Sequence, residues 1–331
     1  MNIVITGGAG FIGHHLVEHF CKTTDHDILV IDRYPQRGRR LDEALALYGR
    51  WQRRVQYRQW DLREPAGIAW EDWPTKVDWA LHLAAESHVD TSILDPVGTI
   101  YKNVIGTTHF LEWCRKRQVG KVLYFSTDEV FGPAPEGVRY QEWDRYKSGN
   151  PYAASKAAGE EIALAYANTY RLPVLISHCM NVFGERQDGE KFLPLVMRKL
   201  LAEEEILIHA DPTCTVAGSR HYIHARNVAS AVETIMRQGE VGDKYNIVGE
   251  VEMANDALAR LIADHLRVPP RLRLVDFHSS RPGHDLRYAL DGSRLQAMGW
   301  TPPRTFADSL QKTIDWTLAH RDWLQPGYGK G

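Results

Sequence analysis

Short apolar runs alternate with helical patterns along the first half of the chain. Apolar runs of strand length occupy positions 2–6, 27–32, 79–85, 121–126 and 173–179. Between these runs, apolar residues recur at helical spacing at positions 13–22, 108–117 and 157–170. Because strands that alternate with helices build βαβ units, this half of the chain predicts a parallel sheet with helices on its faces.

The pattern becomes less regular beyond about residue 181. Helical spacing continues at positions 193–205, 226–238 and 255–266, and one further strand pattern lies at 244–248. We therefore expect an α/β protein with a Rossmann-type doubly wound parallel sheet and a smaller mixed α/β domain. The expected boundaries give the larger domain 1–177 and 221–248, and the smaller domain 178–220 and 249–331.

The composition is that of an ordinary globular protein. Its 331 residues, 44% of them apolar, suffice for a full core, and 40 basic against 42 acidic side chains leave a formal charge of −2. This balance predicts neither nucleic acid nor a membrane surface as a partner. No apolar run long enough to span a membrane and no leader pattern occurs, so we expect a cytoplasmic protein. The cysteines form no C-x-x-C pair, which predicts neither a zinc site nor a disulfide framework.

The stretch TGGAGFIG, residues 6–13, follows the first predicted strand and opens the first predicted helix. Gly7, Gly10 and Gly13 allow a tight turn, close approach of a pyrophosphate and packing of the helix on the strand. Asp32 ends the second strand about twenty residues later, where a carboxylate can accept hydrogen bonds from ribose hydroxyls. A glycine-rich structural turn is the alternative. We expect a dinucleotide site, with NAD preferred to NADP although Arg33 is adjacent.

The stretch YAASK places Tyr152 and Lys156 four residues apart at the start of a predicted helix. Both side chains then share one face of that helix. Because a cation beside a phenol stabilises the phenolate, Tyr152 is a candidate base near neutral pH. A pair on a helix surface would show the same spacing, but the position after a dinucleotide fold favours the catalytic interpretation.

The stretch STDEVFG sets three polar residues at the end of a predicted strand. In an extended chain Thr127 and Glu129 would share one face and Asp128 would point to the other. They can act on one substrate only if the chain leaves the strand here, and Gly132 with Pro133 predicts that it does. A solvated polar turn is the alternative interpretation.

Together these motifs resemble the extended short-chain dehydrogenase/reductase family, and within it the nucleotide-sugar 4,6-dehydratases of the dTDP-glucose type. The resemblance covers nearly the whole chain, through TGGAGFIG, HLAAESHVD, STDEVFG, YAASKAAGE, EKFLP and RPGHDLRYALD. Epimerases and decarboxylases of the same superfamily share the glycines and Y-x-x-x-K but, as a rule, lack the adjacent Asp-Glu pair. The resemblance therefore implies a lyase with tightly bound NAD.

The resemblance also implies a redox-neutral cycle. Tyr152, supported by Lys156 and Thr127, would deprotonate the sugar C4 hydroxyl while hydride passes to NAD. Glu129 would then remove the acidified C5 proton, Asp128 would protonate the departing C6 hydroxyl, and the hydride would return to C6. The product would be a 4-keto-6-deoxy nucleotide sugar. Asp128 must be protonated while Glu129 is ionised, a separation that adjacent carboxyls in a covered site can achieve.

Binding residues follow from the same resemblance, with NAD in the larger domain and the nucleoside-diphosphate sugar in the smaller one. Cofactor contacts would come from Gly7, Gly10, Phe11, Ile12, Gly13, Asp32, Asp61, Leu62, Leu83, Ala84, Ala85, Ser126, Tyr152 and Lys156. Substrate contacts would come from Ser87, His88, Asn103, Asn181, Lys191, Arg220, Arg281 and His284. The two arginines match positions that hold the diphosphate, and a surface ion pair is the alternative for each. The spacing of the histidines in RHYIH is not that of a metal site, so we expect no metal.

Three departures lie in segments that would select the base and the sugar. Where common members read R-x-S-N-N-Y-G-P, this chain reads HCMNVFGE at 178–185. Thr91 stands where an arginine often follows SHVD. The stretch HADPTCTVAGSRHYIHARN replaces the usual segment around Arg220.

Other functions stay open at this point. A UDP-N-acetylglucosamine 5,6-dehydratase would eliminate water differently, and an NDP-sugar C4 epimerase would need only Tyr152 and NAD. A non-catalytic NAD-binding sensor is a different class, against which the joint presence of the catalytic residues argues. By the same resemblance, helices at 107–117 and 153–170 would pair in a homodimer. Phe110, Leu111 and Ala163 allow this, although helical spacing alone does not separate an interface from a core.

Overall fold

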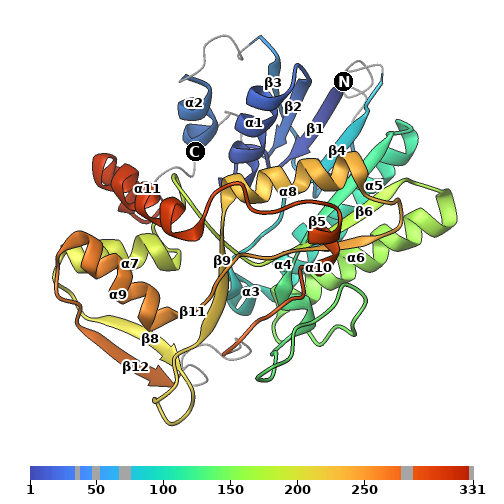
Figure 1. The fold of residues 1–331 in the computed structure, drawn as a ribbon. Helices are drawn as coiled ribbons and strands as arrows, with labels where there is room; N and C mark the ends of the chain where they lie inside the picture. Colours follow the sequence, from blue (N-terminus) through green and yellow to red (C-terminus); the bar gives the residue numbers. More distant parts are fainter. Residues whose placement is uncertain (34–37, 47–52, 67–75, 277–285, 328–331) are drawn as a thin grey trace.

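The computed structural model describes residues 1–33, 38–46, 53–66, 76–276 and 286–327. A seven-stranded sheet forms its centre, with the strand order β10-β6-β5-β4-β1-β2-β3 and parallel pairing throughout (Figure 1). Its strands are β1 (Asn2–Thr6), β2 (Asp27–Asp32), β3 (Val55–Gln59), β4 (Trp79–His82), β5 (Lys121–Thr127), β6 (Val174–Cys179) and β10 (Lys244–Ile247). The predicted Rossmann-type doubly wound sheet is confirmed.

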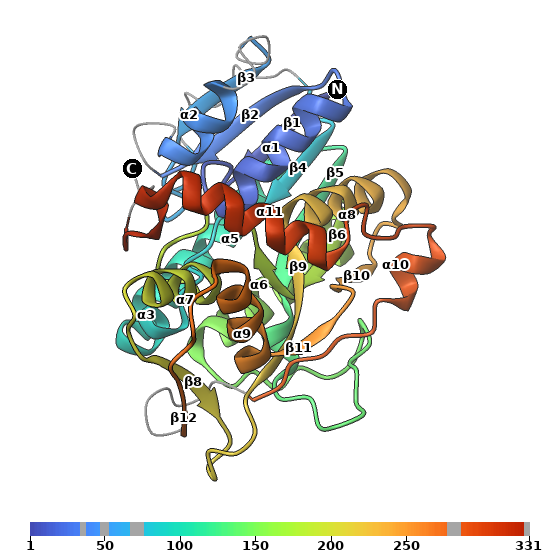
Figure 2. The same cartoon turned by 60° about the vertical axis from the view of Figure 1, so that its left-hand side comes forward.

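Helices cover both faces of this sheet (Figure 2). One face carries α1 (Phe11–Thr23), α2 (Gly38–Ala46) and α8 (Ala225–Gln238). The other carries α5 (Gly106–Lys116) and α6 (Pro151–Tyr170). Alternate strand residues point to opposite faces, so Ile3 and Ile5 pack in the first core while Val4 packs in the second. All three side chains are fully buried.

The order of the strands creates a binding crevice. The chain runs outward from β1 to β3 and then returns to β4 on the other side of β1. In open α/β sheets, ligands bind beyond the carboxyl ends of the strands at such a switch point. The segments that follow β4 there are α3 (Val89–Leu94), α4 (Pro96–Ile100) and the π-helical turn η3 (Tyr101–Ile105).

The remaining elements form a smaller, mixed region. Its strands are β7 (Asn181–Phe183), β9 (Ser219–His224) and β11 (Glu252–Ala254) in one sheet, and β8 (Ile206–Ala210) and β12 (Leu272–Asp276) in another. Its helical segments are α7 (Phe192–Leu201), α9 (Asn255–Leu266), α11 (Phe306–Ala319) and the 3₁₀ turn η5 (Arg321–Leu324). The short helix α10 (Ser293–Ala297) packs instead against β10 of the large sheet. β9 crosses the expected boundary at 220/221, and the domain boundaries stay a prediction.

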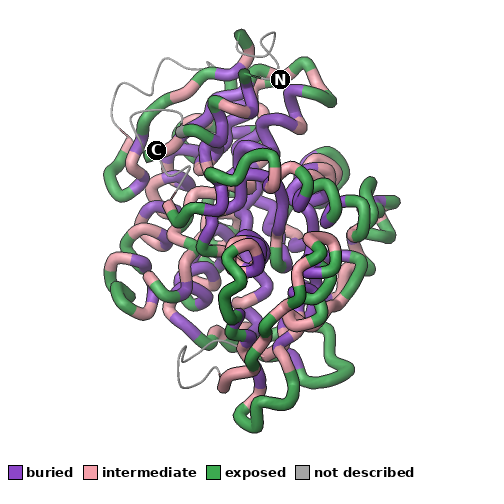
Figure 3. Tube along the Cα trace, turned by 90° about the vertical axis from the view of Figure 1, so that its left-hand side faces the viewer, coloured by how far each residue is buried: buried purple, intermediate pink, exposed green. Residues whose placement is uncertain are grey.

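Buried segments run through the middle of the molecule and exposed segments surround them (Figure 3). The smaller region has its own core, in which Leu193, Ile208 and Leu258 are almost fully buried. Across the described ranges, no helix is both long and apolar enough to cross a membrane. The cytoplasmic location stays a prediction.

Candidate active site

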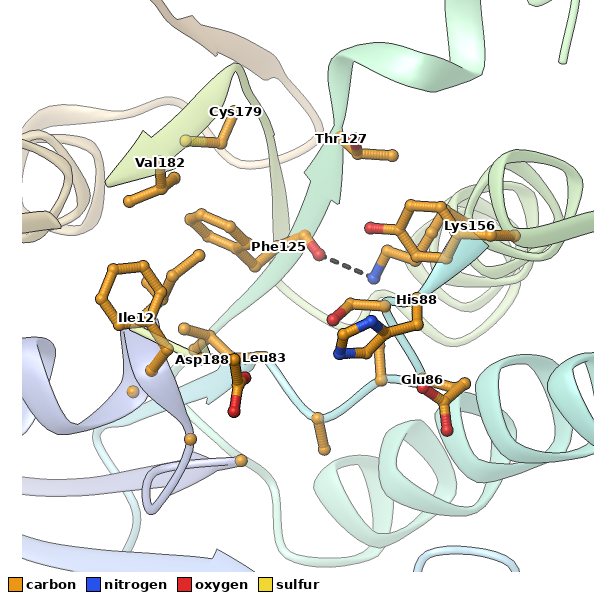
Figure 4. A pocket seen from close by; sticks show the side chains of 18 of the residues that line it. Ile12, Leu83, Glu86, His88, Phe125, Thr127, Lys156, Cys179, Val182 and Asp188 are labelled. Carbon is orange, nitrogen blue, oxygen red and sulfur yellow. Dashed lines mark hydrogen bonds between the residues drawn. The ribbon is translucent and has the colours of Figure 1, made fainter. Parts of the chain in front are cut away.

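A cavity of about 710 Å³ opens beyond the carboxyl ends of β1, β4 and β5. All residues expected to bind the cofactor line this cavity, as do Thr127, Asp128 and Glu129. The expected substrate residues on its wall are Ser87, His88, Asn181 and Lys191. Figure 4 shows side chains from α1, from the segment after β4, and from β5 and β6 around one space.

The glycine turn before α1 has no room for side chains. Gly7 has a φ of +68°, and a Cβ there would lie 2.8 Å from the backbone nitrogen of Ala84. A Cβ on Gly13 would lie 2.1 Å from the carbonyl oxygen of Gly7. Gly10 is the N-cap of α1 and makes no side-chain cap, so the helix begins on backbone N–H groups that line the cavity. This cradle fits the pyrophosphate of a dinucleotide.

Asp32 lies at the end of β2, where a ribose would be bound. Its carboxylate accepts hydrogen bonds from the backbone N–H groups of Arg33 at 2.8 Å and Ala9 at 3.3 Å. Burial raises the pKa of this carboxyl, and the two N–H groups oppose that shift. Asp61, farther along the wall, binds the Arg63 guanidinium through both oxygens.

The chain leaves the sheet directly after Thr127, as predicted. Residues 128–131 form the 3₁₀ turn η4 (Asp128–Phe131), and the Thr127 hydroxyl accepts a hydrogen bond from the N–H of Glu129. The turn ends at Gly132, whose φ of +74° favours glycine. A Cβ at this position would also lie 2.3 Å from the carbonyl oxygen of Lys147. The turn brings all three polar residues of the strand end to the cavity.

Asp128 is a buried carboxyl with an unusual ionisation. Its Oδ1 accepts a hydrogen bond from the Thr127 hydroxyl at 3.0 Å, and its Oδ2 has no partner among the residues that the structure describes. Burial and the charge of Glu129 raise the pKa of Asp128 to about 7, against the opposing charge of Arg220. Glu129 in turn accepts a hydrogen bond from Asn150 Nδ2 at 3.1 Å. Two adjacent carboxyls therefore have different surroundings.

Tyr152 and Lys156 share the first turns of α6, as predicted. The Lys156 ammonium donates to the carbonyl oxygen of Phe125 at 2.7 Å (Figure 4). It also lies 4.3 Å from the ring centre of Tyr124. Burial lowers the pKa of Lys156 to about 7. Burial and the charge of Glu129 raise the pKa of Tyr152 well above its usual value. The protein alone therefore keeps Tyr152 as a neutral phenol.

A buried polar network lies behind this wall, centred on Glu160 one turn after Lys156. The Glu160 carboxylate accepts hydrogen bonds from Ser126 and Tyr146, and lies 3.0 Å from His178 Nε2 and 3.4 Å from Lys244 Nζ. Burial alone would raise the pKa of Glu160, but His178, Lys244 and Ser126 lower it to about 2. Ser126 faces both the network and the cavity, so the ionised Glu160 fixes the end of β5.

Two expected substrate residues do not line the cavity within the described part of the chain. Asn103 is buried, and its amide bonds both backbone groups of Glu86 and the Ser155 hydroxyl. Arg220 is also buried, donates to the carbonyl oxygen of Leu286 at 2.8 Å and stacks on a tyrosine ring. The first residue supports the loop after β4, and the second acts on Asp128 through its charge. Arg281 and His284 lie outside the described residues.

Sequence reasoning missed several residues on the cavity wall. Arg40, Lys102, Met180, Gln187 and Asp188 all line it. Only the arginine had a visible signal, since it ends the basic stretch at 33–40. The described residues contain no group of His, Cys, Asp or Glu side chains suited to hold a metal ion.

The chain is similar to proteins of known activity. It is 32% identical to dTDP-glucose 4,6-dehydratase 1 of Escherichia coli strain K12, over 98% of this chain and 94% of the relative. It superimposes on the dTDP-glucose 4,6-dehydratase DesIV of Streptomyces venezuelae, solved with NAD bound, with a TM-score of 0.87, 32% identity and coverage of 98% and 99%. It also superimposes on the UDP-glucose 4-epimerase of Thermus thermophilus, solved in complex with NAD, with a TM-score of 0.84 and 28% identity. That match covers 96% of this chain and 98% of the epimerase.

These relatives confirm the resemblance drawn from the motifs, and NAD as the expected cofactor. The model of the family described as NAD dependent epimerase/dehydratase matches residues 3–248. The matched range includes the glycine turn, Asp32, the η4 turn and the Tyr152–Lys156 pair. The chain therefore belongs to the NAD dependent epimerase/dehydratase family.

Proposed function

We propose that this protein removes water from a nucleoside-diphosphate hexose of the dTDP-glucose type and forms the 4-keto-6-deoxy sugar. The observation that carries this proposal is the carboxyl pair at the η4 turn. Asp128 is buried and its pKa is raised to about 7, while its neighbour Glu129 is held by Asn150. One group can thus donate a proton while the other accepts one, as elimination across two adjacent carbons requires.

Tyr152 is the proposed base for the C4 hydroxyl. Bound NAD would supply the acceptor for the C4 hydride and its return to C6, and its positive ring would favour the phenolate. Lys156 adds a second positive charge on the same helix face, fixed by the carbonyl of Phe125. The nearby Thr127 side chain lowers the pKa of this phenol, against the larger effects of burial and Glu129. The protein thereby directs the Tyr152 oxygen toward proton abstraction.

Elimination then falls to the carboxyl pair. A C4 ketone makes the neighbouring C5 proton acidic, and Glu129 is the group proposed to remove it. Asp128 is proposed to protonate the C6 hydroxyl so that it departs as water. Its Oδ2, which has no partner in the described residues, is available for this transfer, while Oδ1 is held by Thr127.

The proposal can be tested with a set of nucleotide sugars that carry an isotope label. Purified protein would be incubated with dTDP-, UDP-, CDP- and GDP-hexoses that carry deuterium at C4. We expect one of them to lose one water, as seen by mass, and to carry the deuterium at C6. Loss of water with the label still at C4 would instead indicate 5,6-elimination. If none of these sugars lost water, the proposed function would be wrong.

A C4 epimerase is the second candidate, favoured by the structural likeness to the UDP-glucose 4-epimerase of Thermus thermophilus. Epimerisation would invert C4 without loss of water, so the same assay separates the two activities. Tyr152→Phe is the matched control for both. Because Phe lacks the phenol proton acceptor, we expect this variant to lower C4 oxidation by at least about a hundredfold. An unchanged rate of NAD reduction would contradict the role of Tyr152.

We also propose a homodimer, as expected from the sequence. Phe110, Leu111 and Ala163 are fully buried in the protein's own core and are not available for an interface. Apolar surface lies instead beside these helices, where Leu94 is 86% and Val97 76% exposed. Leu94→Glu should raise the fraction of monomer in analytical ultracentrifugation if this surface joins two copies. A wild-type protein that is monomeric at all concentrations would contradict the dimer.

A further inference from the structure

Arg40 lines the cavity but has no part in the proposed reaction. Arg40 on α2 is an almost fully buried arginine, with a side chain that is 6% exposed. Its Nε donates to the carbonyl oxygen of Arg186 at 2.9 Å, and its Nη2 pairs with the Asp188 carboxylate. The guanidinium also lies 5.5 Å from the ring centre of Trp323. A buried charge is costly unless it is paired and hydrogen-bonded. The contacts of Arg40 meet this need and fix the position of its guanidinium.

The two residues to which Arg40 donates, Arg186 and Asp188, belong to one short segment, residues 185–190, which we call the strap. The strap follows β7 and leads into the substrate residue Lys191 and α7. Its Arg186 has a φ of +65°, lies 3.6 Å from a Glu43 oxygen and stacks on Trp316. A Cβ on Gly189 would lie 2.5 Å from the carbonyl oxygen of Leu324. The strap is therefore confined between α2 and the C-terminal helices.

The strap and Arg40 lie on the cofactor side of the cavity. Arg40 and Asp188 line the same space as Asp32 and the glycine turn. Figure 4 shows the Asp188 carboxylate on the wall that carries Ile12 and Leu83. The charge of Arg40 also acts on Asp32 and lowers the pKa of that carboxyl. The guanidinium thus pairs with the carboxylate of the strap and also acts through its charge on the carboxylate at the expected ribose site.

This arrangement has an electrostatic consequence for a dinucleotide. The pyrophosphate of NAD is negative, and Asp188 places a further negative charge in the same cavity. The Arg40 guanidinium neutralises that carboxylate and links the strap to α2 by a charge-assisted hydrogen bond. With the link closed, Arg40 on α2 and Asp188 of the strap both line the cavity. With the link broken, Asp188 would repel the pyrophosphate of a bound dinucleotide.

We propose that Arg40 and Asp188 form a clasp that holds the strap against α2 and so retains NAD between turnovers. Both are positioning residues, since neither has to touch the reacting atoms. The clasp sets how long the cofactor stays, which a redox-neutral cycle needs because the same NAD returns its hydride to the sugar.

The test measures release of NAD from the purified holoenzyme, without any sugar. A NAD-consuming dehydrogenase in the solution would trap each released molecule, and the trapped product would be followed over time. We expect Arg40→Gln to speed release by roughly a hundredfold and Asp188→Asn by about tenfold, the range for loss of a charge-assisted hydrogen bond. Asp188→Asn should speed NAD release less than Arg40→Gln, because it leaves no unpaired carboxylate in the cavity.

The double variant and two controls decide between a clasp and general damage. If the residues act as one pair, Arg40→Gln/Asp188→Asn should release NAD no faster than Arg40→Gln alone. Arg39→Gln removes the same charge from an exposed neighbour that pairs with Glu43, and it should retain NAD as the wild type does. Arg40→Lys keeps the charge without the fork, so its release rate should lie between those of the wild type and Arg40→Gln.

Several results would overturn the clasp. Release at the wild-type rate in both single variants would do so, as would effects that multiply in the double variant or equal acceleration by Arg39→Gln. If Arg40→Gln proved unfolded by circular dichroism, Arg40→Lys and Asp188→Asn would decide by the same criterion. The outcome is independent of the proposed dehydration, because retention of NAD is measured without a substrate.

Discussion

The two walls of the cavity are built on different physical grounds. The cofactor wall, formed by the glycine turn, Asp32 and the loop after β4, depends on backbone shape, because added Cβ atoms would collide there. The catalytic wall, formed by the η4 turn and the start of α6, depends on ionisable groups held out of water. Burial moves the pKa of Asp128 and that of Lys156 to about 7, from opposite sides. Backbone shape is enough to bind a cofactor, whereas acid–base chemistry needs ionisable groups that burial shifts away from their usual pKa.

The largest effect should come from filling the cofactor wall. Gly13→Ala would place a Cβ 2.1 Å from the carbonyl oxygen of Gly7, where neither backbone can yield. We expect complete loss of bound NAD and a loss of about 3 kcal/mol or more in the free energy of unfolding. Nucleotide extracted from the purified protein and a urea titration measure the two effects.

A second glycine serves as the control for that change. Gly137 has a φ of +74° and open space around its Cβ position. Gly137→Ala should therefore cost only about 1 kcal/mol through backbone strain and leave NAD bound. Retention of NAD by Gly13→Ala would show that shape does not determine the cofactor wall.

The next effect concerns chemistry on the catalytic wall. Asp128→Asn removes the proposed acid and keeps the size of the side chain, so C4 oxidation should continue while elimination slows by about a hundredfold or more. Rapid mixing with substrate would show reduced NAD accumulating. Product formed at the wild-type rate would contradict the role of Asp128.

The same change should affect stability in the opposite direction from Gly13→Ala. The folded protein keeps Asp128 protonated up to about pH 7, whereas the unfolded chain releases this proton near pH 4, so wild-type stability falls as the pH rises between these values. Asp128→Asn should be more stable than the wild type at pH 8 by at most about 4 kcal/mol, with no gain below about pH 4. Thermal unfolding over this pH range measures the difference. If the gain in stability did not depend on pH, it could not come from the ionisation of Asp128.

The smallest effect concerns Arg220, a buried charge that acts on Asp128 of the catalytic wall. Arg220 lowers the pKa of Asp128, so Arg220→Gln should raise it and shift the alkaline fall of the elimination rate to higher pH, by less than about one unit. A pH profile of elimination tests this shift. A rise in KM for the nucleotide sugar with an unchanged pH profile would instead indicate that Arg220 binds the diphosphate.

The cofactor wall could be predicted from the sequence because its determinants are local. A strand end, glycines and a helix start stand together in TGGAGFIG. On the catalytic wall, the turn after β5 is likewise encoded locally, by Gly132. The clasp could not be predicted, because Arg40 and Asp188 are separated by 148 positions and meet only through tertiary packing. Asn103 has the same explanation: its amide is taken up by Glu86 and Ser155, which no local pattern indicates.

The network around Glu160 has a consequence for how such chains diverge. Its carboxylate lies 3.0 Å from His178 Nε2 on β6 and 3.4 Å from the Lys244 ammonium on β10. A homologue with arginine at position 178 would carry that charge on one side chain and could dispense with the lysine. Because both side chains serve the same carboxylate, we expect replacement of His178 by arginine to be tolerated only together with a neutral residue at position 244.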